Sequence, residues 1–268
     1  MKYLYITNDI DTAKICDQLS VDEIFIDLEL RGKSARQSGL NTFISTHQID
    51  DISKIKKVLK TSEILVRIDA MGSWSHDQIN KVISMDPDTL MLPYFKSKAE
   101  VEDFIDIVDG RIKTCLLVET YSAIDILDRI LEIDGVNRIH IGLNDLSIEK
   151  KSKTMFEPYS NDILDNIAKL AISMDVDFGI GGIGYIGSGL VPSPESIIAE
   201  QFRLGSSAVI LSRSFANYTK YKSPKEFKKD FSIRLNDLRN LERRLRKSPN
   251  SFFKVNKDKL ISEIKRIT

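Results

Sequence analysis

The sequence lacks the residues on which several classes of protein depend. It has only two cysteines and three histidines among 268 residues. The cysteines lie far apart in apolar segments, and the histidines are scattered, so neither a disulfide framework nor a Cys/His zinc cluster is expected. No uncharged run approaches the roughly 18 residues that span a membrane, and the first residues show no basic stretch followed by an apolar one. We therefore expect a cytoplasmic protein without a membrane partner.

The chain also has no net charge, because 39 Lys and Arg balance 39 Asp and Glu. A global basic excess is thus not available for binding nucleic acid. The charge is unevenly distributed: residues 216–268 hold 16 basic and 6 acidic residues, which gives this segment a formal charge of +10 and residues 1–215 one of −10. We expect an acidic body with a basic end and no nucleic-acid partner. Binding of nucleic acid or an acidic membrane by the basic segment 234–247 is the alternative.

Eight short apolar runs alternate with amphipathic segments over the first 215 residues or so. Most of these runs are continuously apolar, which is typical of parallel strands covered on both faces. Eight such units in sequence predict an α/β protein with the (β/α)₈ TIM barrel fold, and an open doubly wound sheet is the alternative. The predicted strands are 3–7, 23–29, 63–69, 89–95, 113–120, 138–143, 177–183 and 207–213.

Helical patterns follow most of these runs and replace them after the last one. Residues that can cap a first helical turn precede the amphipathic segments. They are Asp11, Ser45, Thr46, Ser75, Ser97, Ser122 and, with Pro194 after it, Ser193. Beyond the eighth run, segments 223–247 and 255–267 both read as helices. We therefore predict a barrel catalytic domain over 1–217 and a C-terminal helical extension over 218–268.

Charged residues gather where the predicted strands end. The C-terminal strand ends form the active site in barrels of this kind. Like charges that converge there repel one another unless a cation neutralises them. Glu119 and Asp145 end two successive strands, and paired carboxylates are the oxygen ligands that Mg²⁺ or Mn²⁺ prefers. The sequence predicts such a metal site, unless Asp145 only caps a turn and Glu119 pairs with a loop arginine. The other charged strand ends are Asp27, Glu29, Arg67 and Asp69.

Five segments in this order resemble the HpcH/HpaI aldolase and citrate lyase β-subunit family. They are DLE at 27–29, VRID at 66–69, LVET at 117–120, DGVNRIHIGLNDLS at 134–147 and GGIG at 181–184. The resemblance implies a divalent-metal-dependent carbon–carbon lyase or aldolase that acts through the enolate of a pyruvate-like 2-oxo acid or an acyl thioester. By position it implies that Glu119 and Asp145 bind the metal, that Arg67 binds the substrate carboxylate or enolate oxygen, and that Glu29 lies near the metal.

Two residues depart from the family pattern. Pyruvate aldolases of the family carry a catalytic histidine where this chain has Leu30, and a glutamine where it has Leu117. His47, at the predicted start of a helix on the active face, is the candidate for the missing base, with an exposed surface residue as the alternative. These departures also keep open a non-catalytic barrel that retains a metal and anion pocket as a ligand-binding or assembly protein.

Basic and polar residues near the strand ends complete the predicted site. The loop over 30–42 resembles the citrate lyase type of the family, and its cations could bind a phosphate, a second carboxylate or a CoA tail, or form a solvated lid. Glycines over 180–190 allow the backbone to approach a substrate closely. The predicted substrate-binding residues are Arg31, Lys33, Arg36, Arg67, Asn144 and Arg213. We expect a small-molecule substrate, and the resemblance implies a homo-oligomer, a trimer or a hexamer.

Overall fold

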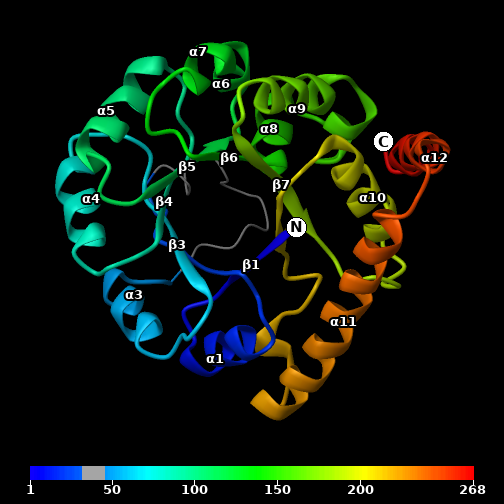
Figure 1. Cartoon of the computed structure of the whole chain (residues 1–268), viewed down its shortest axis with the longest axis horizontal. Helices are drawn as coiled ribbons and strands as arrows, with labels where there is room; N and C mark the ends of the chain where they lie inside the picture. Colours follow the sequence, from blue (N-terminus) through cyan, green and yellow to red (C-terminus); the bar gives the residue numbers. More distant parts are fainter. Residues whose placement is uncertain (32–45) are drawn as a thin grey trace. The chain divides into compact units, whose positions relative to one another are not determined.

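The computed structural model describes residues 1–31 and 46–268, and its strands form one closed parallel barrel in sequence order (Figure 1). The predicted TIM barrel is therefore confirmed. Most strands end two or three residues earlier than expected, because the buried apolar runs continue into loops, as Leu28 and Phe95 do. The strands are β1 (Lys2–Ile6), β2 (Glu23–Asp27), β3 (Glu63–Arg67), β4 (Thr89–Leu92), β5 (Lys113–Val118), β6 (Arg138–Ile141), β7 (Asp177–Ile183) and β8 (Ala208–Leu211).

Helices separate successive strands and follow the last one. Ser97 and Ser193 cap their helices as predicted. The first helix is capped by Asp9 rather than Asp11, because Asp9 Oδ1 accepts the N–H of Thr12 at 2.7 Å. The helices are α1 (Ile10–Gln18), α3 (Ile49–Lys56), α4 (Ser75–Ile83), α5 (Lys98–Val108), α6 (Tyr121–Asp125), α7 (Leu127–Leu131), α8 (Leu143–Lys150), α9 (Ile163–Ser173), α10 (Pro194–Leu204), α11 (Pro224–Leu245) and α12 (Asn250–Lys265), with short 3₁₀ turns at Glu157–Ser160 and Tyr218–Lys220.

The contacts within the chain define two compact units. The first unit is Leu4–His140, and the second is Met1–Tyr3 together with Ile141–Thr268. The second unit thus contains β7 and β8 as well as α11 and α12. The domain boundary that we placed at residue 217 stays a prediction.

In the first unit, strand register determines which side chains share a level of the barrel. Phe25 pairs with Leu65, and Asp27 pairs with Arg67. Residues two apart in a strand point to the same side, so Glu23 shares the face of Asp27. The buried Glu23 carboxylate accepts two hydrogen bonds from Arg138 of β6, at 2.6 and 2.8 Å. This face therefore points into the barrel, with one ion pair at the N-terminal end of β2 and Asp27 at its C-terminal end.

In the second unit, the C-terminal helices bury a continuous apolar face. The helix predicted over 223–247 is present as α11, whose buried positions include Phe227, Phe231 and Leu235. The last helix begins at Asn250, five residues earlier than predicted, because Phe253 is buried and stacks on Phe202 with ring centroids 5.9 Å apart. Among the helices in the described ranges, none is long and apolar enough to cross a membrane.

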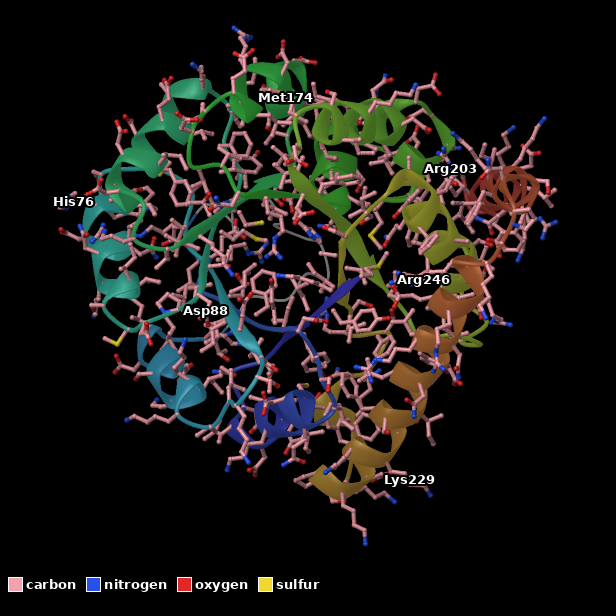
Figure 2. All side chains as sticks on the ribbon, viewed as in Figure 1. His76, Asp88, Met174, Arg203, Lys229 and Arg246 are labelled. Atoms are coloured by element: carbon pink, nitrogen blue, oxygen red, sulfur yellow. The ribbon has the colours of Figure 1, made fainter. Side chains whose placement is uncertain are left out.

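Some polar side chains of the helices project into solvent. Figure 2 shows Lys229 of α11 and His76 of α4 projecting away from the ribbon, and both are exposed.

Candidate functional site

Arg67 lies at the centre of a charged cluster at the ends of β2 and β3. Its Nε and Nη2 atoms donate to the two carboxylate oxygens of Asp27, at 2.9 and 2.7 Å. A carboxylate oxygen of Glu29 lies 3.4 Å from the same Nε. The arginine side chain is only 14% exposed, and its guanidinium carbon lies 5.5 Å from the Phe25 ring centroid. Because planar bidentate pairs are geometrically specific, the guanidinium is held in one orientation.

Three carboxylates act on the charge of this guanidinium. Burial by itself would lower the pKa of Arg67, but the charges of Asp27, Glu29 and Glu119 raise it above its ordinary value. The guanidinium therefore stays charged at every physiological pH. Carboxylates that converge in this way repel one another unless a cation lies between them.

Glu119, a predicted metal ligand, directly follows β5 and is 3% exposed. Its carboxylate accepts the backbone N–H of Tyr94 at 3.1 Å. Tyr94 has a φ of 51°, in the left-handed region that residues other than glycine rarely adopt. Such strained residues cluster at binding and catalytic sites. The backbone after β4 thus points an N–H group at the carboxylate of Glu119.

Asp145, the second predicted metal ligand, belongs to the other unit. It lies in the first turn of α8, a helix that was not predicted, and it is half-buried. Its pairing with Glu119 around a metal stays a prediction. In the two described ranges, no group of three or more His, Cys, Asp or Glu side chains is placed to hold a metal ion.

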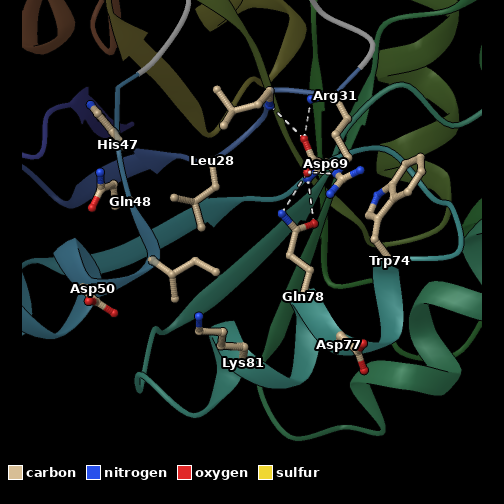
Figure 3. Close-up of a pocket in the computed structure, with 12 residues that line it drawn as sticks. Leu28, Arg31, His47, Gln48, Asp50, Asp69, Trp74, Asp77, Gln78 and Lys81 are labelled. Atoms are coloured by element: carbon tan, nitrogen blue, oxygen red, sulfur yellow. Dashed lines mark hydrogen bonds and ion pairs between the residues drawn. The ribbon is translucent and has the colours of Figure 1, made fainter.

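Asp69 ties the loop after β2 to the loop after β3 (Figure 3). Its Oδ1 atom accepts the backbone N–H groups of Leu30 and Arg31, each at 2.8 Å. Its Oδ2 atom accepts the side-chain amide of Gln78 at 3.0 Å, and its own N–H donates to the oxygen of that amide at 3.2 Å. The sequence analysis placed Asp69 at a strand end but gave it no role. The structure shows that it organises the start of the loop that carries Arg31.

Arg31, a predicted substrate-binding residue, lies over the only tryptophan of the chain. Its guanidinium carbon is 4.6 Å from the Trp74 ring centroid, and its Nε lies 3.6 Å from an Asp69 oxygen. The side chain is nevertheless 59% exposed. The indole is also close to Gly72, where an added Cβ would lie 2.5 Å from the ring. Arg31 is thus a solvent-accessible cation with a restrained orientation.

These residues border a cavity of about 790 Å³ (Figure 3). Leu28, which directly follows β2, also lines the cavity. Trp74 and Gln78 were not among the predicted site residues, although a lone tryptophan in a strand-end loop is a signal that could have found the first. The lining residues are Leu28, Leu30, Arg31, His47, Gln48, Ile49, Asp50, Asp69, Trp74, Asp77, Gln78 and Lys81.

His47, the candidate base, borders this cavity but is buried rather than exposed. It precedes α3, which is capped by Gln48. Its Nδ1 atom accepts the backbone N–H of Asp27 at 3.0 Å. The neutral ring therefore carries its hydrogen on Nε2. Protonation of Nδ1 would break the bond to Asp27, so this geometry favours a neutral imidazole that donates from Nε2 over one that takes up a proton.

The remaining predicted residues lie in the second unit or outside the described residues. Asn144 on α8 and Arg213 after β8 are both exposed and belong to the second unit. Lys33 and Arg36 lie outside the described residues. Leu30, which replaces the family histidine, is 49% exposed, whereas Leu117 is buried in β5.

Gly182, in β7, and Gly184, just after it, are packed against their own chain. An added Cβ on Gly182 would lie 3.2 Å from the carbonyl oxygen of Ile210, and one on Gly184 would lie 2.7 Å from Leu190. These glycines were predicted to let the backbone approach a substrate. At these two positions the close approach is between the glycine backbone and neighbouring protein atoms.

An eight-stranded parallel barrel with acids and an arginine at its strand ends is the architecture of a TIM-barrel enzyme. Residues 4–171 match the model of the HpcH/HpaI aldolase/citrate lyase family. This match spans more than half of the chain, and the chain belongs to that family.

Solved structures of low sequence identity share the fold. An HpcH/HpaI aldolase from Desulfitobacterium hafniense DCB-2 superposes with a TM-score of 0.61 at 14% identity, over 79% of this chain and 85% of that one. An HpcH/HpaI aldolase/citrate lyase family protein from Burkholderia cenocepacia J2315 gives 0.61 at 14% identity, over 80% and 89%. The citrate synthase SbnG gives 0.59 at 15%, over 79% and 86%. A search of curated protein sequences finds no significant match.

Proposed function

We propose that this protein is a divalent-metal-dependent carbon–carbon lyase that acts through the enolate of a 2-oxo acid or an acyl thioester. The observation that carries the proposal is the Arg67 cluster, in which one oriented guanidinium is surrounded by Asp27, Glu29 and Glu119. A fixed cation of this kind stabilises negative charge that develops on a substrate oxygen. Membership of an aldolase and citrate lyase family supports the same class of reaction.

The donor groups present suit Mg²⁺ or Mn²⁺. Both ions prefer carboxylate and water oxygens, and Mg²⁺ commonly takes only one or two protein carboxylates while water and substrate complete its shell. Glu119 provides a buried carboxylate beside the Arg67 guanidinium, and we assign it, with Asp145, as the protein ligands. When bound, such an ion supplies Lewis acidity toward the oxygen atoms of the substrate.

Other side chains of the protein bind and orient the substrate. Asp27 occupies the Nε and Nη2 side of Arg67, so we assign the Nη1 side to a substrate carboxylate or enolate oxygen. Glu29 holds the guanidinium in place. His47, with its hydrogen on Nε2, donates a hydrogen bond as a neutral imidazole. Arg31 binds an anionic group at the far end of the substrate, and Asn144 and Arg213 contribute substrate contacts from the second unit.

The experiment that tests the proposal is exchange of substrate methyl protons in D₂O. Unmodified protein with Mg²⁺ should exchange the methyl protons of pyruvate or acetyl-CoA, measured by proton NMR. Glu119→Gln should abolish the exchange, whereas Glu102→Gln, which changes an exposed glutamate on α5, should not. Exchange is the sharpest assay because it needs only the part of the site that forms the enolate.

A non-catalytic barrel is the second candidate, and two observations favour it. Leu30 stands where family aldolases have their base, and Nδ1 of His47 is engaged by the backbone of Asp27. The protein would then bind an anion or a metal without turning it over. Binding of pyruvate with Mg²⁺ in calorimetry, together with no proton exchange on either substrate, would favour this candidate over the lyase.

We further propose that the protein is a cytoplasmic homo-oligomer, a trimer or a hexamer, with a small-molecule substrate. The basic C-terminal helices, which carry exposed apolar residues such as Ile233 and Val255, support self-association. Multi-angle light scattering of the full chain measures the oligomeric state directly, and a monomer at micromolar concentration would contradict this proposal.

A further inference from the structure

The loops after β7 and β8 are joined to each other where they leave the barrel. The backbone N–H and the hydroxyl of Ser212 both donate to the carbonyl oxygen of Ile183, at 3.0 and 2.6 Å. An added Cβ on Gly184 would lie 3.1 Å from the Ser214 hydroxyl. A displacement of either loop, residues 184–193 or 212–217, would therefore disturb the other.

Arg234 of α11 contacts both of these loops. Its guanidinium carbon lies 3.9 Å from the ring centroid of Tyr185, in the loop after β7. Its Nη1 atom donates to the carbonyl oxygen of Phe215, in the loop after β8. Its Nη2 atom is 2.8 Å from Asp230, one helical turn earlier, which fixes the plane of the guanidinium. The side chain is 21% exposed, so these contacts are partly shielded from water.

The two loops differ in how else they are held. Phe215 packs edge to face on Phe231 of α11, with ring centroids 5.6 Å apart. The far end of the loop after β7 is held by Glu263 of α12, whose carboxylate accepts the N–H of Ser193 at 3.0 Å. Tyr185 lies between β7 and Ser193. Its described contact with α11 is the cation–π contact with Arg234.

We propose that Arg234 is a positioning residue that fixes the loops after β7 and β8 relative to each other, and thereby sets affinity for an anionic substrate. That loop position sets the affinity for a substrate rests on the proposed function. Loops after the seventh and eighth strands are where TIM barrels frequently bind anionic groups. Arg213 lies in one of these loops, and the glycine-rich segment forms the other. Arg234 acts through these loops and not on the reacting atoms.

The first test is hydrogen exchange of the full-length protein without substrate. Arg234→Ala should speed amide exchange in peptides covering 184–191 and 212–217 by about tenfold, because a cation–π contact and a hydrogen bond to a carbonyl are both lost. Arg234→Lys keeps the charge but not the planar fork, so it should recover part of the protection. Arg243→Ala, an exposed arginine on the same helix, is the matched control and should change neither peptide.

The second test separates affinity from chemistry. In the lyase assay, Arg234→Ala should raise KM several-fold with kcat nearly unchanged, and Arg234→Lys should lie between. Faster exchange in both loops with an unchanged KM would overturn the positioning role and leave the lyase proposal standing. Faster exchange in neither loop, or in only one, would overturn the coupling itself. If the unmodified protein has no lyase activity, the proposed function fails, and the exchange result alone decides whether Arg234 couples the loops.

Discussion

The loops after β2 and β3 are held by a different kind of residue from the loops after β7 and β8. In the first unit the holding residues, Asp69 and Arg67, belong to the strand ends themselves. In the second unit they belong to the C-terminal helices, as Arg234 and Glu263 do. The first arrangement orders a site locally within the barrel. The second makes the geometry of a loop depend on a helix that comes dozens of residues later in the chain.

The largest expected effect comes from breaking the local arrangement. Arg67→Ala would leave the buried carboxylates of Asp27 and Glu29 without their cation, so we expect a loss of about 3–5 kcal/mol in the free energy of unfolding. Lyase activity should fall at least about a hundredfold. Urea denaturation and the proton-exchange assay measure the two effects. Arg67→Lys should retain more stability than activity, and a stable, active alanine variant would contradict the role given to this cluster.

The stability of the two units should depend differently on pH and on salt. Burial tends to raise the pKa of Asp17, but hydrogen bonds from the backbone of residues 60–62 lower it to about 2. Because the folded pKa lies below the unfolded one, the stabilisation is present above about pH 4 and is lost as the pH falls toward 2. It amounts to about 2.5 kcal/mol. Urea denaturation between pH 2 and 6 should show this loss, and Asp17→Asn should remove it.

Asp165 provides the contrast in the second unit. Burial tends to raise its pKa, while Lys257 and Arg203, each 2.7 Å away, lower it. Salt screens ion pairs that are partly exposed more strongly than hydrogen bonds from a backbone. Adding salt should therefore weaken the contribution of Asp165 and leave that of Asp17 largely intact. Equal salt dependence for Asp17→Asn and Asp165→Asn would contradict this difference between the units.

The smallest expected effect is on the loops that the C-terminal helices hold. Glu263→Ala removes the acceptor for the N–H of Ser193 at the start of α10, so we expect a loss of about 1 kcal/mol. Amide exchange at Ser193 should rise while exchange at Leu30 and Arg31 stays unchanged. Glu149→Ala, an exposed glutamate of the same unit, serves as the control. A change in the loop after β2 would show that the two arrangements are not independent.

The sequence predicted the contacts at the strand ends better than the contacts of the C-terminal helices. Apolar runs marked all eight strands, and Asp27 and Arg67 could be placed together because both end neighbouring strands. The interaction of His47 with the backbone of Asp27 could not be predicted, because it joins residues 20 positions apart in the sequence. Helix α8, which contains Asp145, was missed because it buries only Leu143 and Leu146 and so shows little periodicity. The contacts of Arg234 depend on tertiary packing that no local pattern reports.

The ion pair between Glu23 and Arg138 has a consequence for how the chain is made. Its two partners are 115 residues apart, so the carboxylate of Glu23 keeps its water shell until β6 has left the ribosome. The first unit then already contains both halves of this pair and of the Asp27–Arg67 pair, whereas α11 has yet to be synthesised. Domains and their parts generally fold as they emerge, from the N-terminus onward. A nascent chain would thus form the charged cluster first, and the loops restrained by α11 and α12 would become ordered last.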